Sequence, residues 1–436
     1  MKILSKYIYF FCLVIGSENL LAQPIAIAPA QSQKTILIGG IIHIGNGKVL
    51  NNGALIFENG IITFCGDITN VKLDMSNALI LEANGQHIYP GLIDAYTQLG
   101  LDEVGAVRAT QDAYEVGSLN PNIRSIISYN TDSRIIPTMT TNGILLSNIV
   151  PTGDMVGGLS SVVQHNAWNY EDAAYIQDLA LNIHWMPRPI AHNDEDVEKI
   201  ELALDKFHKA MNALELLFAD AKNYCNTQST SVNIKLEAMC DVLKGTRRLI
   251  IYVDKSKDII DAITFSKKWG ITPVIAGASD AWMITDYIKS QGVSVILGKT
   301  HALPNRVDEE IDMAYRMPSI LQGAGILYCI SMINTDVWNH RNLPFQAGQA
   351  VAYGIDKEQA LQSITLSVAQ ILGIEKRTGS LEVGKDANII ISKGDILDMR
   401  TSQLTSIFIQ GRNINIENPQ IYQYQRYMDK YNLKEK

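Results

Sequence analysis

The sequence predicts an α/β protein in which a (β/α)8 barrel is joined to a small β-sandwich domain built by both chain ends. Two observations support this. Short apolar runs separated by Gly and Asn turns occur near both ends of the 436-residue chain, and the middle alternates strand-like and helical segments. We assign residues 35–88 with 376–415 to the β-sandwich domain, 89–375 to the barrel and 416–436 to a C-terminal tail.

The first residues have the features of a secretory signal peptide, which we place at residues 1–22. Lys2 and Lys6 form a basic start, followed by an apolar run at residues 7–15 that is too short to span a bilayer. Ala22 offers a small residue for cleavage. The alternative is a strand or helix of the core. We expect export, which in a bacterium means the periplasm, and no other stretch reaches the length of a membrane span.

Composition excludes several classes of partner. Hydrophobic residues make up 47% of the chain and charged residues 19%, as in ordinary globular proteins. The net charge of −8 and the pI near 5.5 argue against nucleic-acid or anionic-membrane partners, because both need a basic face. No Cys-x-x-Cys motif occurs, but Cys225 and Cys240 could form a disulfide in an oxidising compartment.

Both chain ends have the pattern of short antiparallel strands. The N-terminal stretch reads "TILIGGIIHIGNGKVLNNGALIFENGIITFCG", with turns rich in Gly and Asn. The C-terminal part reads "GSLEVGKDANIIISKGD" and then "LTSIFIQGRNI", in the same style. These two regions therefore belong to one β-rich domain, separated in sequence by the barrel.

From about residue 249 the chain alternates strand and helix. The strands are "LIIYV", "TPVIA", "VSVIL" and "ILYCIS", and the segments between them are helical and end at Gly. Fully apolar strands alternating with helices indicate a parallel sheet covered by helices. Upstream, "IIPTMTTNGILLSNIV" and "SSVVQ" are predicted as barrel strands, and a long amphipathic helix near residues 195–225 as an insertion. Catalytic residues of such barrels follow the carboxyl ends of the strands.

Three stretches in order resemble the amidohydrolase superfamily, in particular its imidazolonepropionase-like metal-dependent hydrolases. "PGLIDA" at residues 90–95 is similar to the entry into the first barrel strand. "TLSVAQILGI" at residues 365–374 resembles the last barrel helix, and "GSLEVGKDANIII" at 379–391 resembles the return into the β-domain. The resemblance covers roughly residues 35–415 and implies the same barrel fold and a hydrolase activity.

The resemblance also implies a metal site, and this chain departs from it. Active members place His-x-His after "PG-x-I-D-x", where this chain has Tyr96 and Gln98. The resemblance places a ligand histidine on the fifth strand, where this chain has Tyr252. It places another on the sixth strand near Gly277, and this chain has no histidine there either. The Asp that follows the eighth strand corresponds to Asp336, which the resemblance makes the candidate catalytic residue.

Those replacements make the inherited metal site a doubtful one. A catalytic zinc needs about three His, Asp, Glu or Cys ligands, and a neutral Tyr or Gln is a poor substitute. We therefore expect no cofactor, and a divalent metal such as zinc only if an alternative site exists. His165, His184 and His301 follow strand-like runs and could face the barrel mouth with Asp336. Each could equally be a structural histidine, as Asp336 could be a helix cap.

Two hypotheses for function follow. The first is a hydrolase of carbon–nitrogen bonds in a cyclic amide or peptide-like substrate, with a degenerate metal site and Asp336 as general base. The second is a catalytically inactive homologue that binds a ligand or pairs with an active barrel subunit. The candidate pocket residues are Tyr96, Gln98, Tyr252, His165 and His301. A homo- or hetero-oligomer with a related barrel is the expected assembly.

Overall fold

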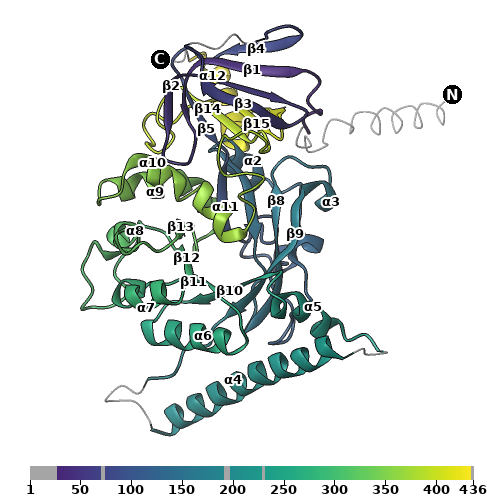
Figure 1. Ribbon diagram of the computed structural model, residues 1–436, viewed down its shortest axis with the longest axis vertical. Coiled ribbons are helices and arrows are strands. Elements are labelled where there is room, and N and C mark those ends of the chain that lie inside the picture. Colours follow the sequence, from purple (N-terminus) through teal and green to yellow (C-terminus); the bar gives the residue numbers. More distant parts are fainter. Residues whose placement is uncertain (1–26, 70–73, 191–196, 228–230, 434–436) are drawn as a thin grey trace, which may run out of the picture.

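The computed structural model describes residues 27–69, 74–190, 197–227 and 231–433, whose strands form two eight-stranded sheets. Figure 1 shows the smaller domain at the top, the larger strand–helix body below it, and the long helix α4 along the underside. The signal peptide predicted for residues 1–22 lies outside the described residues. Within them, no helix is both long and apolar enough to cross a membrane.

The smaller domain is a sheet that contains strands from both ends of the chain. Its strands are β1 Lys34–His43, β2 Val49–Glu58, β3 Ile61–Asp67, β4 Ala78–Glu82, β5 His87–Pro90, β14 Ile389–Ser392, β15 Leu404–Ile409 and β16 Arg412–Ile414. Their order is β16–β15–β14–β5–β1–β2–β3, and β4 pairs with β1. Strand β5 pairs with β1 on one side and with β14 on the other, so it joins the N-terminal and C-terminal strands.

A two-residue turn sets the register of β2 and β3. Asn59 and Gly60 have φ angles of 52° and 80°, and an Asn-Gly pair with positive φ is the favoured type I′ hairpin turn. A Cβ on Gly60 would lie 2.8 Å from the carbonyl oxygen of Gln410. The turn therefore packs directly against the C-terminal part of the same sheet.

The larger sheet is the predicted barrel. Its strands are β6 Leu92–Thr97, β7 Ile144–Ile149, β8 Val156–Gln164, β9 Ala174–His184, β10 Arg248–Val253, β11 Val274–Gly277, β12 Ser294–Leu297 and β13 Tyr328–Ile330. They pair in chain order from β6 to β13. All neighbours are parallel except that β8 runs antiparallel to β7 and β9. The fold class predicted from the sequence, a barrel with a separate β-domain, is confirmed.

The segment that follows helix α10 closes the barrel between its first and last strands. The amide of Ile330 in β13 donates to the carbonyl of Ser363 at 3.1 Å, and the amide of Ile93 in β6 donates to that of Ile364 at 3.0 Å. One residue further along the chain from each of these, the Ser331 hydroxyl donates to the Asp94 carboxylate at 2.8 Å. These bonds replace a direct ladder between β6 and β13.

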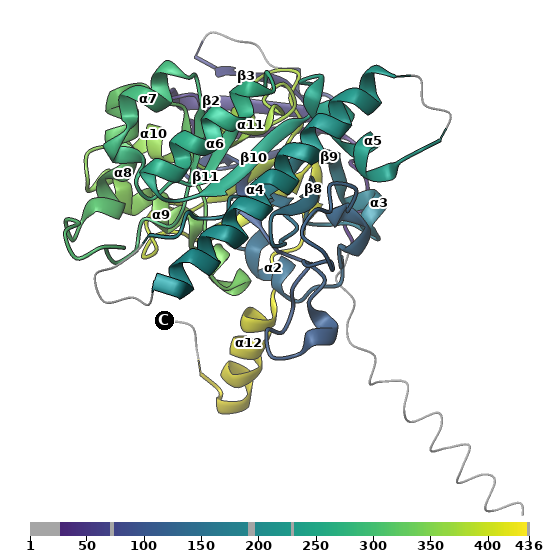
Figure 2. The same cartoon turned by 90° about the horizontal axis from the view of Figure 1, so that it is seen from below.

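The helices cover the barrel and extend below it. They are α2 Ile135–Thr140, α3 Tyr170–Ala173, α4 Val197–Asn226, α5 Ile234–Leu243, α6 Ser256–Lys268, α7 Thr285–Ser290, α8 Met313–Ala324, α9 Leu343–Val351, α10 Lys357–Gln362, α11 Leu366–Leu372 and α12 Pro419–Tyr431. Short 3₁₀ helices are η2 Arg108–Thr110, η3 Ser125–Ser128, η4 Ala281–Met283 and η5 Val337–Asn342. Seen from below, α4 crosses the barrel and α12 stands away from the body (Figure 2).

One strand prediction was wrong. Residues 135–140 form helix α2, and the strand begins only at Ile144. Pro137 lies in the first turn of α2, where the amide that proline lacks has no intrahelical acceptor. Its apolar neighbours are buried on a helix instead of a strand, and periodicity alone cannot distinguish the two in such a short run.

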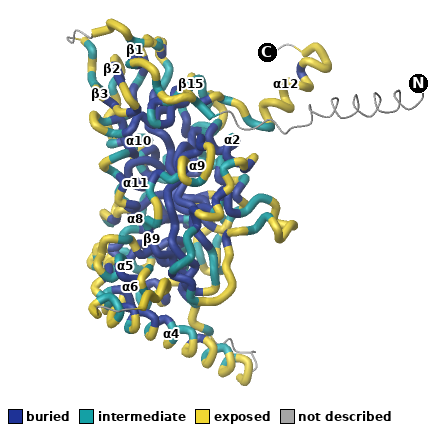
Figure 3. Tube along the Cα trace, turned by 90° about the vertical axis from the view of Figure 1, so that its right-hand side faces the viewer, coloured by how far each residue is buried: buried dark blue, intermediate teal, exposed yellow. Residues whose placement is uncertain are grey.

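Side chains of the barrel strands alternate between two apolar layers. Ile93, Leu146, Ile250 and Cys329 belong to the cluster inside the barrel. Their chain neighbours, such as Leu92, pack in the outer cluster with the helices. Figure 3 shows this buried interior continuing through both domains, while the outward side of α4 is exposed.

A disulfide links the insertion helix α4 to α5. Cys225 and Cys240 are joined, with their Cα atoms 5.6 Å apart. Helix α4 also packs on the barrel through Phe218, whose ring centroid lies 5.0 Å from that of Phe265 on α6. Helix α4 is therefore attached to α5 by a disulfide and to α6 by aromatic packing.

Candidate functional site

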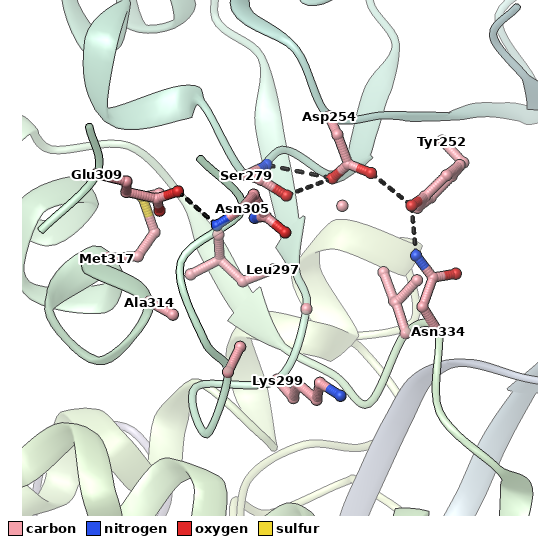
Figure 4. A pocket seen from close by; sticks show the side chains of 14 residues that line it. Tyr252, Asp254, Ser279, Leu297, Lys299, Asn305, Glu309, Ala314, Met317 and Asn334 are labelled. Atoms are coloured by element: carbon pink, nitrogen blue, oxygen red, sulfur yellow. Dashed lines mark hydrogen bonds between the residues drawn. The ribbon is translucent and has the colours of Figure 1, made fainter. Parts of the chain in front are cut away.

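A cavity of about 280 Å³ opens at the carboxyl ends of β10, β11, β12 and β13. This is the face on which barrel enzymes carry their sites. The wall consists of Tyr252, Asp254, Gly277, Ser279, Leu297, Gly298, Lys299, Ala302, Asn305, Glu309, Ala314, Met317, Ile333 and Asn334. Figure 4 shows the polar side chains converging on it from the strand ends and from the loop after β12.

Hydrogen bonds fix one wall of this cavity. The Tyr252 hydroxyl donates to one oxygen of Asp254 at 2.5 Å and accepts from the Asn334 amide at 2.5 Å. The other Asp254 oxygen accepts from the hydroxyl and the amide of Ser279, at 2.6 and 3.3 Å. Burial and the adjacent Asp254 raise the pKa of the Tyr252 phenol above its usual value, so the phenol is neutral.

The backbone after β11 is shaped to fit this wall. Gly277 has φ 88°, and a Cβ on it would lie 2.8 Å from both the Asp254 carboxylate and the Tyr252 ring. Ala278 follows with φ 55°, a conformation that L residues seldom adopt. Strained backbone of this kind occurs at binding sites, where the surrounding structure enforces it. A larger residue at position 277 would displace the Asp254–Tyr252 pair.

Two tyrosines and a histidine fill the barrel beside the cavity. Tyr96 is buried at the end of β6, and its hydroxyl lies 3.1 Å from Nε2 of His184 at the end of β9. The Tyr252 ring lies 6.5 Å from that of Tyr96 and 5.7 Å from that of His184, centroid to centroid. Burial raises the pKa of Tyr96 and lowers that of His184. All three side chains are therefore neutral near pH 7.

Gln98 lies at the edge of this group. It follows β6, is half-buried, and its amide reaches the carbonyl of Val150 at 3.5 Å. The structure thus brings together Tyr96 and Tyr252 from the predicted pocket set, and adds His184 to them.

His165 lies away from the barrel mouth. It follows β8, the antiparallel strand, so it lies at the opposite end of the barrel from residues that follow parallel strands. Its Nε2 is 2.9 Å from the Ser147 hydroxyl, and burial lowers its pKa to about 4. A second histidine is also buried and paired, since His340 Nδ1 lies 2.5 Å from the Asp94 carboxylate.

His301 and Asp336 are on the surface. His301 is exposed, and its ring packs edge-on against Tyr315 with centroids 5.4 Å apart. Asp336 is exposed and caps η5, where its side chain accepts from the amide of Trp338 at 2.9 Å. Neither residue lines the cavity. The catalytic role of Asp336 and the pocket roles of His165 and His301 stay predictions.

Sequence reasoning missed six polar residues of the cavity: Asp254, Ser279, Lys299, Asn305, Glu309 and Asn334. The signal was present for Asp254 and Lys299, because each stands within two residues of the end of a predicted apolar strand. A rule that inspects every polar residue directly after a parallel strand would have selected both.

Comparison with known proteins agrees with the fold. A model of the Amidohydrolase family matches residues 158–422. An amidohydrolase of Hapsidospora irregularis, tasK, is 20% identical over 402 residues, covering 82% of this chain but only 39% of the longer fungal protein. An imidazolonepropionase of Picrophilus torridus is 24% identical, covering 80% of this chain and 87% of its own.

A solved structure extends this likeness to three dimensions. An amidohydrolase from Thermotoga maritima superposes with a TM-score of 0.77 at 21% identity, over 87% of this chain and 99% of that one. The barrel and the β-domain built by both chain ends define an amidohydrolase-type fold. The chain belongs to the amidohydrolase family.

The residues that the resemblance places at the family's metal positions do not match the donors that a divalent catalytic metal needs. Tyr96, Gln98, Tyr252 and Gly277 offer two neutral phenols, one amide and no fourth side chain. Across the described ranges, no three His, Cys, Asp or Glu side chains form a group that could hold a metal ion. We therefore derive no reaction step through a metal.

Proposed function

We propose that this protein is a catalytically inactive member of the amidohydrolase family that binds a small ligand in the cavity at the ends of β10–β13. The observation that supports this is the exchange of four ligand positions for Tyr96, Gln98, Tyr252 and Gly277. Both phenols have hydrogen-bond partners. That of Tyr96 contacts His184, and that of Tyr252 contacts Asp254 and Asn334.

Chemistry favours binding over metal-assisted hydrolysis. A phenol binds a metal well only after it loses its proton, and burial of Tyr96 and Tyr252 opposes that loss. The hydrogen bonds of Tyr252 would also have to break before a metal could bind. The wall around Asp254 is instead preorganised, which lowers the entropy lost when a ligand binds.

Hydrolysis of a carbon–nitrogen bond is the competing function, and family membership favours it. A metal-free version needs a general base within reach of the substrate. Asp336 was predicted for that role, and it would have to act from an exposed cap outside the cavity wall. That position makes the hydrolase the weaker proposal.

We further propose that the protein is exported and that it assembles with itself or with a related barrel. The disulfide between Cys225 and Cys240 supports export, because such bonds persist in oxidising compartments. The ligand on this proposal is a small amide or peptide-like molecule.

Metal content and hydrolysis test the proposed function. The full chain would be produced by export without chelator and assayed by elemental analysis, then incubated with cyclic amides and dipeptides, with and without added zinc or manganese. We expect much less than one metal ion per chain. We also expect the substrates to be hydrolysed no faster than in buffer without protein. Stoichiometric metal, or turnover that is lost in Asp336→Ala but kept in the exposed control Asp132→Ala, would establish the hydrolase instead.

A further inference from the structure

The cavity wall contains three charged side chains, Asp254, Glu309 and Lys299, that form no ion pair, although Asp254 and Glu309 accept hydrogen bonds from neutral donors. Within the described residues, no Lys, Arg or His nitrogen lies within 4.0 Å of the carboxylates of Asp254 and Glu309, and Lys299 likewise has no carboxylate neighbour. Other charges on the same loop are paired, since Arg306 contacts Asp280 at 2.9 Å and Asp308 at 3.0 Å. Asp254 and Glu309 are half-buried and Lys299 is exposed, so all three charges are accessible to a charged ligand that enters the cavity.

The acidic side of the cavity suits an ammonium group. A carboxylate has about four acceptor positions, and three donors from Tyr252 and Ser279 already reach Asp254. One acceptor position remains for a ligand. The Tyr252 ring lies in the same wall, and an aromatic ring beside a carboxylate is a favourable environment for an alkylammonium ion. A carboxylate ligand on this side would be repelled.

The opposite side of the cavity supplies a cation. Lys299 extends along the wall from the end of β12, and Figure 4 shows it on the other side of the view from Asp254. Its ammonium is a flexible point charge that suits a single carboxylate. An acidic and a basic group facing one small cavity are complementary to a ligand that carries both charges.

The remaining wall is apolar and small. Leu297, Met317 and Ile333 line the cavity and are buried, with 4%, 5% and 6% of their surface exposed. A volume of about 280 Å³ lies just below the roughly 300–1,000 Å³ typical of ligand sites. The cavity therefore fits a compact molecule with a short apolar side chain.

We propose that the ligand is a zwitterion of the amino-acid type, with its ammonium group on Asp254, its carboxylate on Lys299 and an apolar side chain against Leu297, Met317 and Ile333. This rests on the ligand-binding function proposed above and names the chemical class that the site selects.

Isothermal titration calorimetry on the full chain tests the assignment group by group. The probes are L-leucine and L-methionine, N-acetyl-L-leucine, which lacks the ammonium, and L-leucinamide, which lacks the carboxylate. We expect a free amino acid to bind and each derivative to bind at least tenfold more weakly. Asp254→Asn and Lys299→Met should each weaken binding of the parent at least tenfold. The exposed controls Asp132→Asn and Lys376→Met should not.

Each contrary result has a distinct meaning. Equal binding of N-acetyl-L-leucine would overturn the role of Asp254, and equal binding of L-leucinamide would overturn that of Lys299. Failure of every probe to bind would overturn the amino-acid assignment as a whole. None of these results bears on metal content or hydrolysis, so they are separate from failure of the proposed function.

Discussion

The hydroxyl of Tyr96, at the end of β6, lies 3.1 Å from Nε2 of His184, at the end of β9. The pair joins β6 to β9 across the interior of the barrel. Because both groups are neutral, the contact is an ordinary hydrogen bond between buried partners. A hydrogen bond between two side chains therefore links the ends of β6 and β9 inside the barrel.

Removing that hydroxyl should destabilise the fold. In Tyr96→Phe, His184 loses a buried hydrogen-bond partner, so we expect the free energy of unfolding to fall by about 1–3 kcal/mol. Urea denaturation followed by circular dichroism measures this. Tyr114→Phe removes a hydroxyl from an exposed tyrosine and should change stability by less than about 0.5 kcal/mol. Equal stability of Tyr96→Phe and wild type would mean that the pair contributes nothing.

Stability should fall in mild acid because of buried histidines. Burial lowers the pKa of His165 to about 4, below the 6.5 of the unfolded chain. The folded state therefore binds fewer protons, and its stabilisation is complete above pH 6.5 and is lost as the pH falls toward 4. The loss from this residue is on the order of 3 kcal/mol.

Comparison of variants isolates the contribution of His165. Wild type, His165→Asn and the exposed control His208→Asn would be unfolded in urea at pH 7, 6 and 5. The pH dependence should be shallower in His165→Asn and unchanged in His208→Asn. A variant with the wild-type slope would show that His165 is not held neutral.

The sequence allowed most of the fold to be predicted but only part of the site. Strands β10–β13 were predictable because each is a short apolar run between a Gly and a helical segment. The absence of a His-x-His motif could be seen in the sequence because Tyr96 and Gln98 directly follow the recognisable stretch PGLIDA. The Tyr252–Asn334 contact was not visible, since 82 residues separate the two side chains. The position of His165 could not be predicted either, because nothing in the chain shows that β8 runs antiparallel.

Reduction of the disulfide should loosen the insertion. Cys225 and Cys240 are 15 residues apart, and closing a loop of that length stabilises a fold by about 3 kcal/mol in the chain-entropy account. In Cys225→Ser/Cys240→Ser we expect that loss in urea unfolding, together with faster hydrogen exchange at the end of α4. Cys65→Ser, which removes a free thiol, serves as the control. Equal stability with and without reductant would contradict the prediction.

Among the glycines that line the cavity, Gly277 should be the one whose substitution by alanine lowers stability most. Gly277→Ala combines positive φ with a Cβ placed 2.8 Å from Asp254 and Tyr252. Gly270 has a similar φ of 78° but open space around its Cβ position, so Gly270→Ala reports the backbone strain alone. We expect about 1 kcal/mol of destabilisation in Gly270→Ala and 1–3 kcal/mol more in Gly277→Ala. Only Gly277→Ala should also weaken ligand binding, because the clash displaces the Asp254 carboxylate. If both variants lose the same stability and bind ligand alike, the close fit of the β11 turn against Asp254 does not shape the site.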